Sequence, residues 1–110
     1  MTSKVSFPAG RNGMPPMHPG EILKELYLDP MGLSVNKLAE RMHVTATRIN
    51  DVVRGKRGIT ADTAMRLGKV FGTTAQLWLN LQNMYELRLI ETSEDDSIST
   101  LEPFEMLELA

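Results

Sequence analysis

Cysteine is absent from this chain of 110 residues, which excludes disulfide bonds and thiol chemistry. Aromatic side chains are scarce, with one Trp, two Tyr and three Phe, so aliphatic residues and methionine must fill the core. No apolar run approaches the ~20 residues that a membrane-spanning helix needs, and the N-terminus lacks the apolar centre of a signal peptide. We therefore expect a cytoplasmic protein with no membrane segment and no covalent cross-link.

The sequence also lacks the patterns that mark a catalytic or metal-binding protein. The glycines within residues 55–72 do not have the spacing of a phosphate-binding loop, and no local arrangement of Ser and His indicates an activated nucleophile. Neither His18 nor His43 has a cysteine or a carboxylate cluster nearby, and we expect His18 to make a local polar contact at a helix start. We predict that the chain is not an enzyme and that it holds no metal and no cofactor.

Basic residues are missing from the last part of the chain. Residues 1–90 contain 12 Lys and Arg against 7 Asp and Glu, a net charge of +5. Residues 91–110 contain 7 acidic residues and no basic one, a net charge of −7, and the two parts add up to the −2 of the whole chain. We interpret the body as mildly basic, which is compatible with nucleic-acid binding, and the end as an acidic tail.

The composition favours an all-α fold, because helix-forming residues dominate and no segment alternates apolar and polar residues for long. At this length we expect one domain with tails. A flexible arm rich in Pro and Gly is predicted over residues 1–16, a compact five-helix domain over residues 17–90, and the acidic tail over residues 91–110. Residues 91–100 are expected to be disordered, whereas residues 101–110 are apolar enough to dock on a surface or to fold back on the last helix.

The first helix is predicted over residues 19–28. Proline suits its first turn, where a backbone N–H is not needed, and the pair Asp29-Pro30 should end it, because the residue before a proline avoids the α region. The predicted buried stripe consists of Ile22, Leu23 and Leu26.

Two further helices are predicted after residue 59. Thr60 can cap a helix over residues 61–71, which Gly72 ends, and Thr73 or Thr74 can open a last helix that reaches about residue 90. The predicted apolar side of the helix over residues 61–71 consists of Ala64, Met65, Leu67, Gly68 and Phe71.

Residues 34–58 have the layout of a helix-turn-helix. Ser34 and Thr45 can each cap a short helix, since a hydroxyl oxygen accepts an otherwise unpaired backbone N–H of the opening turn. A tight turn at residues 42–44 joins the two helices, and the small side chain of Ala39 lies where they would press closest. The apolar positions that could close one core are Val35, Leu38, Ala39, Met42, Val44, Ile49, Val52 and Val53.

The second of these helices would present short polar side chains, followed by cations, a combination that suits the major groove of DNA. The outward-facing positions are Thr45, Ala46, Thr47, Asn50 and Asp51, and the cations that follow are Arg54, Lys56 and Arg57. Asp51 has two possible partners, a cytosine amino group or a nearby arginine, Arg48 or Arg54. The alternative is a plain helical packing unit with a solvated polar face and a basic loop.

The last helix has two apolar faces on a helical wheel of ~100° per residue. An ordinary core-facing stripe, within an arc of ~140°, consists of Leu77, Trp78, Leu81, Met84, Tyr85 and Leu89. Leu79 and Ile90 lie on the opposite side, with Leu87 near them. A small monomer would have difficulty covering both faces, so the second face suggests a dimer interface or a partner surface.

Three sequence segments support the interpretation of the chain as a DNA-binding domain that dimerises. They are Met-His-Pro-Gly-Glu-Ile-Leu at 17–23, Arg-Gly-Lys-Arg-Gly-Ile-Thr at 54–60, and Phe-Gly-Thr-Thr-Ala-Gln-Leu-Trp-Leu-Asn-Leu-Gln at 71–82, followed by Tyr85, Leu87 and Arg88. Together they resemble the HigA (VapI-like) antitoxins, a branch of the Xre/Cro-type regulators. The resemblance implies a five-helix, lambda-repressor-like domain that dimerises and binds palindromic double-stranded DNA in its own promoter. It also implies that the protein neutralises a small HigB-like RNase toxin encoded beside it.

The resemblance also assigns residues by position. Those matching the base-facing positions of the family are Thr45, Ala46, Thr47, Asn50 and Asp51, and those matching its phosphate-directed positions are Arg48, Arg54, Lys56 and Arg57. Residues of the last helix expected at the dimer interface are Leu79, Gln82, Asn83, Tyr85, Glu86, Leu87 and Ile90. His43 departs from the glycine of many helix-turn-helix sequences, which puts strain on the turn, because histidine tolerates a positive φ less well.

Two alternative functions remain open at this stage. The chain could be a stand-alone Xre-type repressor without a toxin, or a pure interaction protein that has lost DNA binding, although the basic residues after the second helix argue against the latter. The acidic tail could be solvated filler, could compete with DNA for the basic face, or could cover a basic surface of a toxin.

Overall fold

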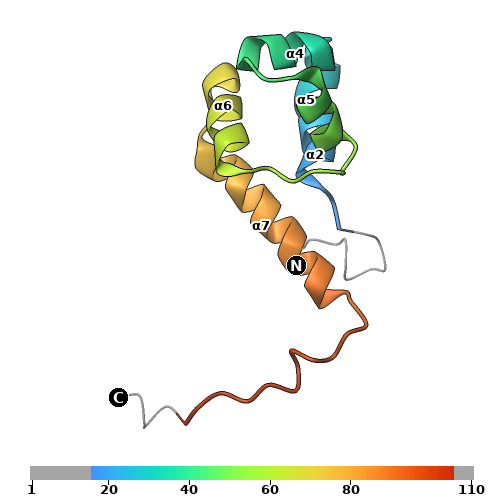
Figure 1. The fold of residues 1–110 in the computed structure, drawn as a ribbon, viewed down its shortest axis with the longest axis vertical. Helices are drawn as coiled ribbons and strands as arrows, with labels where there is room; N and C mark the ends of the chain where they lie inside the picture. The colour runs from blue at the N-terminus through green and yellow to red at the C-terminus, as the bar shows by residue number, and fades with distance from the viewer. Residues whose placement is uncertain (1–15, 106–110) are drawn as a thin grey trace.

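The computed structural model describes residues 16–105, and within this range it contains helices and no strands (Figure 1). The elements in chain order are α2 (Pro19–Ile22), η1 (Leu23–Leu28), α3 (Asp29–Met31), α4 (Val35–Met42), α5 (Ala46–Val53), α6 (Ala61–Phe71) and α7 (Ala75–Glu91). The first three follow one another without a break and form one helix, so the predicted all-α fold with five helices is confirmed. The predicted arm lies outside the described residues, except for Pro16.

The first helix does not end at Asp29-Pro30, as predicted, but runs on to Met31. Its middle, η1, is a π-helix, in which the N–H of Asp29 bonds to the carbonyl of Lys24, five residues earlier. A proline in a helix ordinarily clashes with the carbonyl four residues before it. The wider π-helical turn relieves this conflict, and the chain leaves the helix only at Gly32, which has a φ of +61°.

The π-helical turn also changes which side chains of the first helix are buried. Leu26, predicted to lie in the core, is 66% exposed, whereas Leu23 and Leu28 are buried and Tyr27 is half-buried. One extra residue in the turn rotates everything that follows it around the helix axis. The predicted stripe was therefore wrong after Leu23, because it assumed an ordinary α-helical period.

Each of the other helices begins with a hydroxyl side chain, as predicted. Ser34 and Thr45 accept the backbone N–H of the residue three positions later at 3.0 and 3.1 Å, and Thr60 does the same for α6 at 3.3 Å. Thr74 is the residue that caps α7, with a bond of 3.1 Å. The neighbouring Thr73 instead accepts the indole N–H of the core tryptophan at 2.9 Å. These caps satisfy backbone donors that helix starts leave unpaired.

The turn between α4 and α5 places His43 in the left-handed region, with a φ of +60° and a ψ of +42°. Among the described residues it is the only one other than glycine with a positive φ. The turn closes through bonds from the N–H of His43 to the carbonyl of Glu40 and from the N–H of Val44 to the carbonyl of Ala39. The departure from glycine at this position therefore does not prevent the left-handed turn, because histidine adopts it.

The core lies where α7 meets the other helices. Trp78 is fully buried, with the rings of Tyr27 and Phe71 at 5.2 and 6.5 Å from its own. The buried apolar residues are Leu23, Leu28, Leu38, Ala39, Met42, Ile49, Val52, Ile59, Ala64, Leu67 and Trp78. They come from every helix, so α5 is held between α2 and α4 by a single core.

A glycine sets the distance between α2 and α5. A Cβ atom at Gly20 would lie 1.9 Å from the carbonyl oxygen of Val52, which is far inside van der Waals contact. Only glycine therefore permits this approach. The close contact fixes α5 against the start of the first helix.

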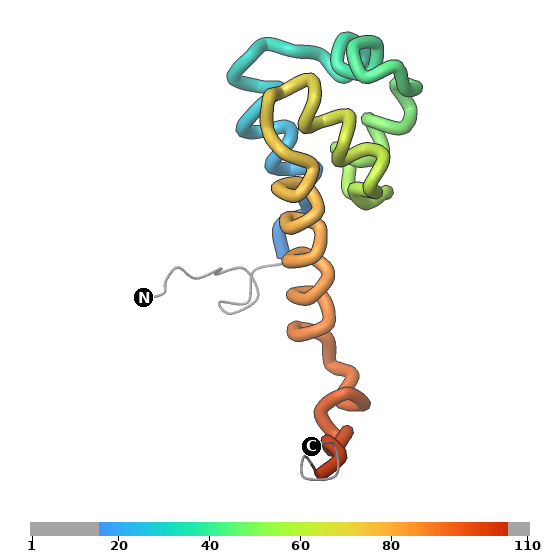
Figure 2. The backbone as a smooth tube through the Cα atoms, turned by 90° about the vertical axis from the view of Figure 1, so that its left-hand side faces the viewer, coloured from blue at the N-terminus to red at the C-terminus, as the bar shows by residue number. Residues whose placement is uncertain are grey.

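The C-terminal end of the last helix, α7, extends past the other helices (Figures 1 and 2). Of its predicted core stripe, Trp78 is buried and Leu81 and Tyr85 are half-buried, but the outer positions Leu77, Met84 and Leu89 are exposed. The prediction was wrong for those three. Met84 and Leu89 lie in the C-terminal half of the helix, which extends past the other helices, whereas Leu77 lies in the first turn, at the edge of the buried face. No helix within residues 16–105 is long and apolar enough to cross a membrane.

The acidic tail was predicted to begin at residue 91, but Glu91 is still the last residue of α7. The described remainder of the tail, residues 92–105, continues away from the body beyond α7 (Figure 2). Its backbone is organised by local turns, in which the N–H of Asp95 bonds to Ser93 and the N–H of Ser97 bonds to Asp95, both at 2.9 Å. Every residue of this segment is exposed. The tail therefore leaves the domain as an extension with short-range structure.

Candidate nucleic-acid interface

Helix α5 turns one face to the core and the other to solvent. Ile49 and Val52 are fully buried, whereas Thr45, Thr47 and Asn50 are exposed. Of the remaining predicted base-facing positions, Ala46 and Asp51 are half-buried at the edges of this face. The structure thus brings three short polar side chains together on an open helix surface, which is the geometry needed to enter a major groove.

A hollow of about 280 Å³ separates this face from the start of α4. Its walls include Ser34 and Asn36 from α4 and Thr47 and Asn50 from α5. Asn36 was not among the predicted site residues, although it follows the Ser34 cap by two residues and lies in the first turn of α4. The positive end of that helix faces the same side as the polar face of α5, an arrangement that favours an anion such as a phosphate.

The loop after α5 carries exposed cations. Arg54, Lys56 and Arg57 are all exposed, and Gly55 allows the turn through a φ of +78°. Asp51 forms an ion pair with Arg57 at 3.6 Å, and not with Arg48 or Arg54, the two arginines that the sequence offered as alternative partners to a cytosine. Over residues 16–105 no ion pair engages Arg54 or Lys56, which leaves both charges available to a phosphate backbone.

The basic loop is anchored to α7 by Gln82. This side chain is only 8% exposed, accepts the backbone N–H of Ile59 at 2.8 Å, and donates to the carboxylate of Glu86 at 2.8 Å. A Cβ atom at Gly58 would lie 2.8 Å from the Gln82 amide nitrogen, so the loop rests directly on it. Gln82, predicted at the dimer interface, is placed by the structure inside the chain.

His18 supports the same loop from the other side. Its Nδ1 atom accepts the N–H of Gly20 at 2.8 Å, which caps the first helix, and its ring meets that of Tyr85 edge-on at 4.8 Å. Burial lowers the pKa of His18, against the opposing effects of the Glu21 carboxylate and a hydrogen bond to the backbone of Arg57. The expected local contact at a helix start is confirmed, and the neutral ring is the form that the fold favours.

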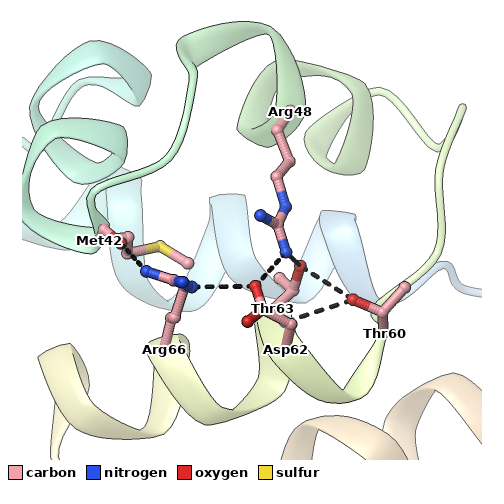
Figure 3. Close-up of polar contacts among 6 residues, drawn as sticks. All are labelled: Met42, Arg48, Thr60, Asp62, Thr63 and Arg66. Carbon is pink, nitrogen blue, oxygen red and sulfur yellow. Dashed lines mark hydrogen bonds and ion pairs between the residues drawn. The ribbon is translucent and has the colours of Figure 1, made fainter.

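Arg48 has a different place from the one expected. Although it lies on α5, its guanidinium points to α6, where it pairs with the carboxylate of Asp62 and donates to Thr63 at 2.9 Å (Figure 3). Arg66 binds the same carboxylate at 2.9 Å and donates to the carbonyl of Met42 at 2.8 Å. The hydrogen bonds from Arg66 and Arg48 lower the pKa of Asp62, so the carboxylate stays charged.

This network, which we call the Asp62 bridge (Met42, Arg48, Asp62, Thr63 and Arg66), connects the end of α4, helix α5 and helix α6. The side chain of Arg48 is 24% exposed, and its donors face α6, away from the polar face of α5. We therefore infer that Arg48 positions α5 and does not contact phosphate. The sequence could not show this, because Asp62 lies 14 residues further along the chain.

The other residues expected at the dimer interface follow α7 outward. Leu79 and Tyr85 are half-buried. Asn83, Glu86, Leu87 and Ile90 are exposed, and the two apolar side chains among these are 59% and 55% exposed. The helix thus carries an open surface on which apolar and polar side chains alternate. No group of three or more potential metal ligands occurs in the part of the chain that the structure describes.

Comparison with known proteins agrees with this geometry. The helix-turn-helix family HTH_3 matches residues 23–78. Virulence-associated protein I of Dichelobacter nodosus is 54% identical over 99 residues, which cover 90% of this chain and 91% of the relative. Antitoxin HigA-1 of Vibrio cholerae is 36% identical over 72 residues, which cover 66% of this chain and 68% of the relative.

Solved structures extend the comparison to three dimensions. Antitoxin HigA of Pseudomonas aeruginosa, solved with the higBA promoter, has a TM-score of 0.76 and 43% identity, and the match covers 82% of this chain and 99% of that one. The family consists of DNA-binding regulators and is not one of enzymes. The residues matched by the HTH_3 family, 23–78, include all of α5 and the loop that follows it. This chain therefore belongs to the HTH_3 helix-turn-helix family and, within it, to the HigA (VapI-like) antitoxins.

Proposed function

We propose that the protein is a cytoplasmic antitoxin that represses its own operon as a homodimer and neutralises a small RNase toxin. One observation carries the DNA-binding part. The exposed Thr45, Thr47 and Asn50 lie on a helix that the Asp62 bridge holds in place, beside the unpaired cations Arg54 and Lys56. In this proposal the polar side chains read bases and the cations hold phosphates.

The dimer part is supported by the pattern of α7. If a two-fold axis passes between Met84 and Tyr85 and the two helices run antiparallel, Leu79 meets Ile90 of the other chain, and Asn83 meets Glu86. A two-fold interface requires such reciprocal pairs. Leu87 borders this surface, so the apolar side chains of Leu79, Leu87 and Ile90 would be covered in the dimer. Two α5 helices would then enter successive major grooves of a palindrome, about 34–36 Å apart.

The DNA-binding proposal is tested by titrating the protein onto the DNA upstream of its own gene over a salt series. We expect Thr47→Ala to alter the preference for DNA sequence. We expect Lys56→Ala to weaken binding to all DNA sequences alike and to lower the slope of log affinity against log salt concentration by about 1. If both variants bind like the parent protein, the assigned face is wrong. Sedimentation of the free protein at several concentrations tests the dimer separately.

The toxin part is supported by the family alone. A low-salt affinity purification of the tagged protein from its own host, read by intact-mass spectrometry, tests it. A stoichiometric second small basic chain supports the antitoxin function. Recovery of this chain alone, from cells that express the neighbouring genes, favours a stand-alone repressor.

A further inference from the structure

A groove of about 620 Å³ lies between the end of α4, the length of α6 and the start of α7. None of the exposed polar residues of α5 lines it, so it is separate from the surface proposed to read DNA. Cations are provided by Arg41, Arg66 and Lys69, against the single carboxylate of Asp62. Because Asp62 already binds two arginines, the groove as a whole is positive.

The walls of the groove also offer apolar surface. Met65 was predicted to lie on the buried side of α6, but it is 65% exposed and lines this groove together with Val70. The prediction failed because α4 stops short of this part of α6, so no residue within 16–105 covers it. An occupant that combines acidic groups with large apolar side chains would satisfy both kinds of surface.

The acidic tail has this chemistry. The apolar side chains of Ile98, Leu101 and Phe104 are 59 to 78% exposed, and Glu102 and Glu105 lie between and beside them. The sequence continues in the same way to its end, as Met-Leu-Glu-Leu-Ala at 106–110. Large apolar groups left in water are unfavourable, which indicates that this segment has a surface to cover.

The direction of α7 indicates whether the acidic tail reaches the groove of its own chain or the groove of another chain. Ala75, the first residue of α7, lines the groove, and the helix then carries the chain away from it for 17 residues, or about 25 Å. The tail continues away from the body (Figures 1 and 2). The tail therefore points away from the groove of its own chain.

In the proposed antiparallel dimer the same direction leads to the other chain's groove. The two-fold axis between Met84 and Tyr85 places Glu91, the last residue of α7, opposite Trp78 of the other chain, one helical turn from Ala75. Leu101 follows ten residues after Glu91, a span of at most about 36 Å. Ala75, Leu79, Glu86 and Ile90 also share one side of the helix, so the groove is continuous with the proposed dimer surface.

We propose that residues 101–110 of one chain dock in this groove of the second chain of the dimer, with their glutamates beside Arg41, Arg66 and Lys69 and their apolar side chains against Met65 and Val70. The exchange is reciprocal, so each chain receives the tail of the other. The inference depends on the proposed dimer and extends it to a segment that the helix pairing alone leaves exposed.

The absence of native cysteine makes cross-linking a direct test. We would combine Val70→Cys in the groove with Pro103→Cys in the tail of the full-length protein and add a short bis-maleimide linker. The expected product is a covalent dimer joined at these two positions, and Lys69→Glu in the same background should reduce its yield. As controls, each single variant should give no covalent dimer, and neither should Pro103→Cys combined with the exposed Glu25→Cys on the first helix.

Each other outcome of the cross-linking experiment refutes a specific part of the proposal. A linker that joins the two cysteines within one chain places the tail in its own groove and refutes the exchange. Cysteines that each react singly, in a protein that sediments as a dimer, refute docking and leave the proposed function intact. A protein that sediments as a monomer refutes the proposed dimer, and the exchange falls with it.

Discussion

Arg48 on the helix proposed to read DNA is bound to Asp62 on α6, and this pair connects the helix-turn-helix to the helix that follows it (Figure 3). Thr63 shares the arginine, and Arg66 shares the aspartate. The placement of α5 relative to the rest of the domain thus depends on charged groups at its edge as well as on its buried face.

Loss of this pair should weaken DNA binding without changing its electrostatic character. For Arg48→Ala we expect a loss of affinity of up to about tenfold, because α5 is less firmly held. The slope of affinity against salt concentration should stay as in the parent protein, since the guanidinium points away from the DNA. Anisotropy titrations at four salt concentrations measure both quantities.

Asp62→Asn is the matched variant, because it keeps the shape of the side chain and removes its charge. It should resemble Arg48→Ala, and the double variant should lose no more than the stronger single one, as residues of one network are not additive. A lower salt slope for Arg48→Ala would show instead that Arg48 contacts phosphate.

The burial of His18 should make stability depend on pH. Its pKa in the folded protein lies below the ordinary value of 6.5, so the unfolded chain binds the proton more readily. The contribution of the neutral ring is complete above pH 6.5 and is lost as the pH falls from there through the lower pKa of the folded state. His18→Asn retains an oxygen that can accept the N–H of Gly20, and it should reduce the fall in stability over this pH range. Urea unfolding of both proteins from pH 7.5 to 5 measures the difference. An equal fall in the free energy of unfolding of the parent protein and of His18→Asn would contradict this role of His18.

Gln82 should matter for the fold of a single chain. Replacing it by Leu leaves the N–H of Ile59, a residue 4% exposed, without its partner. An unsatisfied buried donor costs roughly 1–3 kcal/mol, so the free energy of unfolding should fall by about that amount. DNA affinity should fall as well, because the loop that carries Lys56 is loosened.

The exposed Asn83 beside it is the control. Asn83→Ala should leave the stability of the chain unchanged and weaken only dimerisation, which sedimentation at several concentrations can measure. If Gln82→Leu changes the dimer constant and not the stability, then Gln82 acts at the interface as first expected.

Gly20 should tolerate no side chain. The Cβ of Gly20→Ala would lie 1.9 Å from a backbone carbonyl of α5, and neither helix can yield without disturbing the core. We expect a loss of several kcal/mol, larger than the ~1–3 kcal/mol typical of overpacking, because the atom that is met is backbone. Gly32→Ala provides the comparison, since it meets no atom within 4 Å and has only the strain of its positive φ, about 1–2 kcal/mol. Thermal unfolding of both variants ranks the two effects.

Local chemistry explains which parts of the fold could be predicted from the sequence. The caps at Ser34, Thr45 and Thr60 act within three residues, so the helix starts follow from a short stretch of chain. The π-helical turn could not be predicted in this way. It depends on which carbonyl receives the N–H of Asp29, and a hydrophobic pattern does not specify that choice.

The residues of the candidate site also differ in whether local sequence is enough to predict their roles. Exposed Thr47 and Asn50 follow from their position on an amphipathic helix. The roles of Arg48 and Gln82 do not, because their partners are 14 and 23 residues away in the chain. Long polar side chains can turn toward solvent or toward a neighbouring element, and only the packed structure decides between the two.

The overhang of α7 has a consequence for the lifetime of the protein. In a single chain its last two turns have few neighbours, and a helix end without neighbours frays into a segment that proteases can enter. If the proposed dimer covers these turns, then association and resistance to degradation become one equilibrium. A dilute pool of the chain is then cleared faster than a concentrated one, so the amount of protein in a cell would respond more than proportionally to a change in its synthesis.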